Sequence, residues 1–85
     1  MPAYTTRVEL HKATGEDYTN LHAAMEERGF ARTITSGKGV TYHLPWGEYE
    51  FSGTETRADV LRMAMEAAGS TGRKYEVLVT QSAGR

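Results

Sequence analysis

Ala-Tyr-Thr-Thr-Arg-Val-Glu-Leu-His, residues 3–11, is the stretch that decides the fold, because apolar and polar side chains alternate along it. Tyr4, Val8 and Leu10 fall on one side of an extended segment. The polar residues of the stretch fall on the other side. A period of two is typical of a strand with one buried and one exposed face. Helices elsewhere in the chain must then cover the apolar face.

The first helix pattern follows directly. Thr14 precedes Asp17 by three residues, a spacing that predicts an N-cap with a variant of the capping box. Apolar residues then recur at helical spacing, and Gly29 is a natural stop because glycine accepts the left-handed conformation that ends many helices. A helix is therefore expected near residues 15–28.

A second helix is expected near residues 55–68, with Ser52 or Thr54 as its N-cap. Its apolar stripe comprises Val60, Leu61, Ala64, Met65 and Ala68. Each element should contribute to one shared core. The residues expected there are Leu10, Leu21, Ile34, Leu61 and Val77.

Three further strands are indicated by alternation at residues 30–35, 40–44 and 74–80. A turn at residues 36–39 joins the first two of these. Pro45 cannot donate a ladder hydrogen bond, so the strand that precedes it should kink and resume only near Glu48.

The resulting order is β-α-β-β-α-β, which predicts an α+β fold of ferredoxin-like topology. Its antiparallel sheet would have the strand order 4-1-3-2, with both helices on one face. We expect one domain over residues 1–81 and a frayed tail over residues 82–85. The uncovered sheet face would carry Arg7, Glu9, His11, Thr33, Thr35, Thr41 and His43.

Composition excludes several classes of site. The 85 residues carry a net charge of −1 and contain no cysteine, so disulfides, thiolate metal sites and cysteine nucleophiles are excluded. No apolar run has the length of a membrane span, and a cysteine-free small domain fits a reducing cytoplasm. The balanced charge is unlike that of a typical DNA-binding protein, and no metal-ligand or cofactor motif is visible. We expect no DNA, membrane, metal or cofactor.

His11 and His43 are expected on the open face of adjacent central strands. Two imidazoles so placed could cleave RNA without a metal, one activating the 2′-hydroxyl and the other protonating the leaving oxygen. Arg7 could stabilise the phosphate charge. The alternative interpretation is that these are ordinary exposed polar side chains.

Two aromatic residues bear on nucleic-acid binding. Tyr42 shares its strand phase with Val40 and Leu44, so it is expected in the core. The aromatic platform of an RNA-recognition motif would then be missing. Trp46 is interpreted as a lid over the core edge or, if exposed, as part of a partner surface.

The stretches that carry a family resemblance are residues 3–11, 17–18 with 21–25, 29–30 with 32–34, Thr41-Tyr42-His43-Leu44-Pro45, Thr71-Gly72-Arg73-Lys74-Tyr75 and residues 77–80. In this order, over most of the chain, they resemble a family of short bacterial and phage proteins, the GhoS-like antitoxins of type V toxin–antitoxin systems. The resemblance implies a ferredoxin-like fold. It also implies a sequence-selective endoribonuclease that cuts the messenger RNA of a small membrane toxin. The family's proposed basic residue on the first helix aligns near His22.

Two functional hypotheses follow. The first is a metal-independent endoribonuclease in which His43 is the preferred catalytic residue, His11 the second and His22 the reserve, with RNA held by Arg7 and Arg32. The second is a non-catalytic ferredoxin-like module that binds a protein partner through its open sheet face or Trp46. Both a monomer and a homodimer are compatible with the sequence.

Overall fold

The structure is a computed structural model that describes residues 3–35 and 38–82. Its elements, in chain order, are β1 (Ala3–Leu10), α1 (Gly15–Glu27), β2 (Thr33–Thr35), β3 (Thr41–His43), β4 (Glu48–Ser52), α2 (Arg57–Gly69) and β5 (Tyr75–Ser82). The expected α+β class, with two helices and antiparallel sheets, is confirmed. Residues 36 and 37 of the predicted turn and residues 83–85 of the predicted tail lie outside the described residues. Ser82, also assigned to that tail, ends β5 instead.

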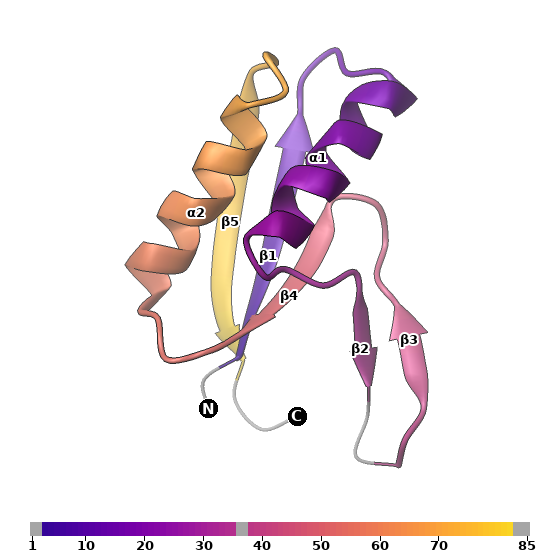
Figure 1. Cartoon of the computed structure of the whole chain (residues 1–85), viewed down its shortest axis with the longest axis vertical. Coiled ribbons are helices and arrows are strands. Elements are labelled where there is room, and N and C mark those ends of the chain that lie inside the picture. Colours follow the sequence, from indigo (N-terminus) through magenta and orange to yellow (C-terminus); the bar gives the residue numbers. More distant parts are fainter. Residues whose placement is uncertain (1–2, 36–37, 83–85) are drawn as a thin grey trace.

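β1 is the central strand of a three-stranded antiparallel sheet, between β4 and β5. β2 and β3 form a separate two-stranded sheet. Figure 1 shows α1 and α2 on the same side of the three-stranded sheet, with the β2–β3 hairpin at the lower right, beyond the end of α1. The two sheets are connected at one isolated antiparallel bridge, where Ala31 and Glu50 exchange two backbone hydrogen bonds of 2.8 Å.

The predicted interruption after the third strand is confirmed. β3 ends at His43 and β4 begins at Glu48. Between them the amide of Glu48 donates to the carbonyl of Pro45 at 3.0 Å, which closes a tight turn. Gly47 has φ +86°, and a Cβ there would lie 2.5 Å from the carbonyl oxygen of Val8. Only glycine fits this turn, because any side chain would collide with β1.

Both helices begin with a capping box. In α1 the predicted pair is confirmed: the amide of Asp17 donates to the Thr14 hydroxyl at 3.3 Å, and the Thr14 amide donates to the Asp17 carboxylate at 2.9 Å. The predicted caps of α2 were wrong. Thr56 caps that helix together with Asp59, because β4 continues to Ser52 and the chain must turn before a helix can start.

The core lies between the helices and the three-stranded sheet. Of the five expected core residues, Leu10 and Leu21 are buried, while Leu61 and Val77 are partly buried against the core. The prediction for Ile34 was wrong: it is partly buried and does not belong to the core cluster. The larger aromatic contribution comes from Phe30, Tyr49 and Phe51.

The assignment of Val40 and Tyr42 to the core was also wrong. Their exposed fractions are 48% and 57%. The cause is the position of the hairpin, since α2 packs on β1 and β5 while β3 pairs only with β2 beside the helical layer. Alternation along β3 therefore distinguishes two faces, but no helix covers either face.

Candidate functional site: a basic end of the sheet

β1 ends and β5 begins at the upper end of the molecule in Figure 1. Lys12, Arg73 and Lys74, together with His11 and Gly72, line one surface cavity, and we call these five residues the basic end. The amide of His11 donates to the carbonyl of Lys74 at 2.8 Å, so the two connecting segments are fixed to each other. Lys12 adopts φ +54°, the left-handed conformation needed where the chain leaves β1.

Two carboxylates, those of Asp17 and Glu76, adjoin the basic end. Arg73 Nε donates to Asp17 Oδ2 at 2.8 Å, which ties the start of α1 to the turn before β5. The backbone amide of Thr14, followed by the Arg73 guanidinium, holds the pKa of Asp17 below its ordinary value. Neither Lys12 nor Lys74 forms an ion pair with any residue in the described part of the chain. Two ammonium groups are therefore available to an anion.

His11 supplies an imidazole to the basic end, and an imidazole can act as a general acid or base. Its Nε2 atom lies 3.4 Å from Glu76 Oε2, and both residues are exposed. The carboxylate of Glu76 can therefore orient the ring. The arrangement thus combines a proton-transfer group with unpaired cations, and these two components suit phosphodiester chemistry.

The open face of the three-stranded sheet has the opposite charge. Because Tyr4, Thr6 and Val8 are buried, the other side chains of β1 and their cross-strand partners point away from the helices. This open face comprises Thr5, Arg7, Glu9, Glu48, Glu50, Glu76, Leu78 and Thr80. This face therefore carries four carboxylates and one guanidinium.

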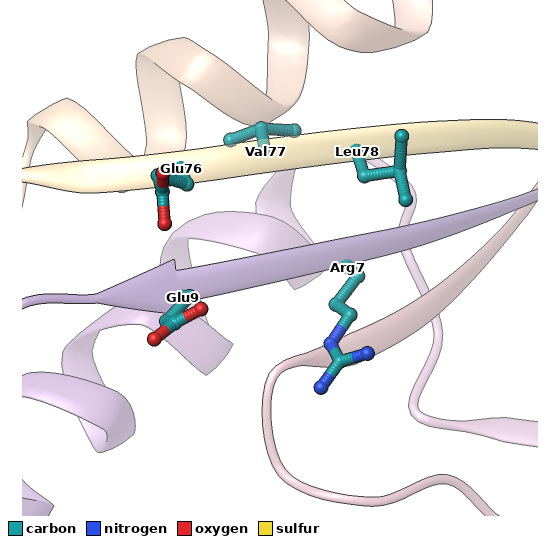
Figure 2. Close-up of a pocket in the computed structure, with 5 residues that line it drawn as sticks. All are labelled: Arg7, Glu9, Glu76, Val77 and Leu78. Carbon is teal, nitrogen blue, oxygen red and sulfur yellow. The ribbon is translucent and has the colours of Figure 1, made fainter.

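Arg7, an expected RNA contact, lies within this acidic face. It lines a cavity with Glu9, Glu76, Val77 and Leu78, and Figure 2 shows these residues on the neighbouring strands β1 and β5. An excess of carboxylates on the same face as this guanidinium opposes the approach of a phosphate, whose binding relies on neutralisation by cations. The open face is thus a poor surface for RNA.

The structure does not bring His43 and His11 together. His43 lies on β3, pairs with Thr33 of β2 and is exposed. His11 directly follows β1. The strand that lies between β1 and the hairpin is β4, which begins only at Glu48. The expectation that the two histidines occupy adjacent strands was therefore wrong, because the kink at Pro45 separates β3 from β1.

His22 has a different environment. The residue is 8% exposed, and its Nδ1 lies 2.5 Å from the hydroxyl of Tyr49. Burial raises the pKa of Tyr49, so the phenol stays protonated and donates to Nδ1. Nε2 then carries the imidazole proton and has no hydrogen-bond partner among the described residues. Burial, followed by the charge of half-buried Arg32, lowers the pKa of His22.

Trp46 covers this buried histidine and is still 63% exposed. Its ring centroid lies 5.6 Å from that of His22, in an edge-to-face arrangement, and 5.8 Å from that of Tyr18. Trp46 therefore packs on the core edge with one side, while its other side faces solvent.

Sequence reasoning missed Lys12, Arg73 and Lys74 as site residues. The signal was present in the order of elements, because antiparallel neighbours β1 and β5 place the residues after the first strand next to those before the last. Leu10 pairs with Tyr75 at this end of the sheet. Basic residues just beyond that pair had to lie close together.

Within residues 3–35 and 38–82, no group of three or more His, Asp or Glu side chains is arranged to hold a metal ion. In the same part of the chain, neither helix has the length and apolar character needed to cross a bilayer. A scan against models of known protein families and a search of the curated proteins both gave no match.

Proposed function

We propose that this chain is a small RNA-binding domain that cleaves single-stranded RNA without a metal, and that it does so at the basic end. The observation that carries the proposal is the position of His11, 3.4 Å from Glu76 and in the same cavity as Lys12, Arg73 and Lys74. The resemblance to the GhoS-like antitoxins supports a cytoplasmic endoribonuclease whose target is the messenger RNA of a small membrane toxin.

The finer fold assignment belongs to the same proposal. The β5-β1-β4 sheet, with the segment before β2 attached to β4 at the Ala31–Glu50 bridge, supports one ferredoxin-like sheet of order 4-1-3-2. In this interpretation β3 and β4 are two halves of a single third strand that Pro45 interrupts. The last and first strands would then meet at the basic end.

The proposed reaction is an internal transesterification. The scissile phosphate lies between the ammonium groups of Lys12 and Lys74, which offset its charge. Neutral His11 takes the proton of the 2′-hydroxyl, the 2′-oxygen attacks phosphorus, and the bond from phosphorus to the 5′-oxygen breaks. A lysine ammonium donates the proton that the leaving 5′-oxygen takes up. The products are a 2′,3′-cyclic phosphate and a 5′-hydroxyl.

The test compares two exposed histidines. Purified protein is incubated with mixed-sequence single-stranded RNA in EDTA, and the new ends are identified. His11→Ala should lower the cleavage rate by about 10²-fold or more, which is the loss expected for a missing general base. His43→Ala, on the exposed hairpin, is the matched control and should cleave at the wild-type rate. If His43→Ala lowered the cleavage rate and His11→Ala did not, the catalytic histidine would be His43 on β3. Undiminished cleavage by both variants would exclude both histidines from the reaction.

A second candidate function is a non-catalytic module that binds a basic segment of a protein partner. The acidic open face favours it, since Leu78 is 63% exposed among four carboxylates. Absence of cleavage with any RNA, combined with binding of a Lys-rich peptide that Glu9→Gln and Glu48→Gln weaken, would support this function instead.

A further inference from the structure

We infer that Trp46 is a stacking platform for one unpaired base of an RNA strand whose phosphates lie on the basic end. The inference deepens the proposed function and rests on it. It adds the class of ligand, a single strand with accessible bases, and a contact outside the cleavage chemistry. Trp46 presents a π-surface to solvent, since 63% of the residue is exposed.

The indole is held in place from behind. Tyr18 and His22 contact its inner side, with ring centroids 5.8 and 5.6 Å away. The turn that carries it is fixed on β1, because the amide of Val8 donates to the carbonyl of Gly47 at 2.7 Å. A ring packed in this way loses little further freedom when a base stacks on its outer side.

Tyr18 connects this platform to the basic end. Its hydroxyl accepts a hydrogen bond of 3.2 Å from the amide of Leu10, the residue before His11. The neighbouring carboxylate of Asp17 accepts one of 2.8 Å from Arg73. The side chain of Tyr18 therefore lies between Trp46 and Leu10, which is next to His11 of the basic end. Tyr18 and Asp17 both lie near the start of α1. A strand bound by its phosphates at Lys12 and Lys74 can continue past Tyr18 and place one of its further nucleotides over Trp46.

Stacking on an exposed aromatic ring discriminates between RNA forms. Every base has a π-face, so the contact tolerates any sequence, but in a duplex both faces of each base are already covered. The cations alone bind single strands, duplexes and inorganic phosphate through the same charge. Trp46 would thus supply the preference for unpaired RNA that the lysines cannot supply.

Because the chain contains one tryptophan, the tryptophan emission reports on the surroundings of Trp46 alone. The probe is a short single-stranded 2′-O-methyl oligoribonucleotide, which lacks the 2′-hydroxyl and cannot be cleaved by the proposed reaction. It should quench Trp46 emission saturably, whereas inorganic phosphate and the duplex form of the oligonucleotide should not. Affinity is measured separately by the anisotropy of a labelled strand.

Trp46→Ala should weaken binding of the single strand by about tenfold or more, the effect typical of one stacked base, without changing its salt dependence. Trp46→Phe keeps a smaller ring, so its effect should be smaller, and it serves as the test if the alanine variant unfolds. Lys12→Ala is the matched comparison, and it should reduce the slope of log affinity against log salt by about 0.7, the value for one neutralised phosphate of a single strand.

Binding that leaves the emission unchanged and is insensitive to both Trp46 variants would overturn the stacking contact while preserving the RNA-binding function. Equal quenching by the duplex would also overturn it. If the oligonucleotide does not bind, so that Lys12→Ala has no binding to weaken, the proposed function fails and the inference fails with it.

Discussion

His22 is a buried residue whose protonation the folded structure disfavours. Its imidazole donates no hydrogen bond from Nε2 to a described residue, and its Nδ1 accepts one from Tyr49. Protonation would place a charge in this buried site, and the Tyr49 hydroxyl would have to change from donor to acceptor towards Nδ1. Glu26 favours the charged form, but burial and Arg32 act more strongly in the other direction.

We predict that the domain loses stability as the pH falls through the range in which His22 titrates. The pKa of His22 in the folded chain lies below its ordinary value of 6.5, so the unfolded chain binds the proton more readily. The resulting stability is complete above the unfolded pKa and decreases as the pH drops towards the folded one. Urea midpoints measured across this range give the slope.

His22→Phe is the control for that slope, because it preserves an aromatic ring and removes the titrating group. The variant should show a flatter dependence of the urea midpoint on pH between about 8 and 5.5. An equally steep dependence in the variant would assign the effect to another group.

Core packing gives a second prediction at the residue scale. Leu21 is fully buried, whereas Leu61 is only partly buried against the core. Leu21→Ala should therefore cost about 2–5 kcal/mol of the free energy of unfolding, and Leu61→Ala less, because a partly exposed side chain buries less apolar surface. Chemical denaturation of both variants measures the difference. Equal losses would show that the exposed side of α2 is covered by something else.

At the scale of elements, the capping of α2 can be tested by substitution. Thr56→Ala removes the hydroxyl that accepts from the amide of Asp59 at 3.2 Å, and it should destabilise the domain by about 0.5–2 kcal/mol. Thr54→Ala is the matched control two residues earlier and should leave the thermal midpoint unchanged. A larger loss in the control would restore Thr54 as the cap.

The elements themselves could largely be predicted from the sequence, because their signals are local. The Thr14–Asp17 box and the break at Pro45 depend on neighbouring residues and were predicted in the right places. The choice of Ser52 or Thr54 failed because the end of β4 is set by its pairing with β1. The prediction that Tyr42 is buried was wrong for a related reason, since alternation cannot say which face a helix will cover.

The candidate site was harder to predict than the elements. His11 was identified from its chemistry, but its neighbours Lys12 and Lys74 are 62 positions apart in the chain and meet only through the β1–β5 pairing. The expected contact between His11 and His43 required a register that the kink does not provide. Spatial clusters of charge depend on tertiary arrangement, which single-residue patterns do not contain.

At the scale of the whole molecule, a net charge of −1 conceals two regions of opposite sign. The open face of the sheet carries four carboxylates and Arg7, and the basic end carries Lys12, Arg73 and Lys74. An anionic strand would thus be repelled from the face and attracted to the end, so the molecule would orient its ligand before any contact forms.

The most direct test of RNA binding at the basic end is the salt dependence of affinity for an uncleavable single-stranded RNA. It is measured for three proteins: wild type, the Lys12→Ala/Lys74→Ala double variant and Arg7→Ala. We predict that the double variant binds more weakly and that its plot of log affinity against log salt is shallower by about 1.4, since each phosphate neutralised on a single strand adds about 0.7 to the slope. Arg7→Ala should retain the wild-type slope. A shallower slope for Arg7→Ala, with the double variant unchanged, would place RNA on the open face and contradict binding at the basic end.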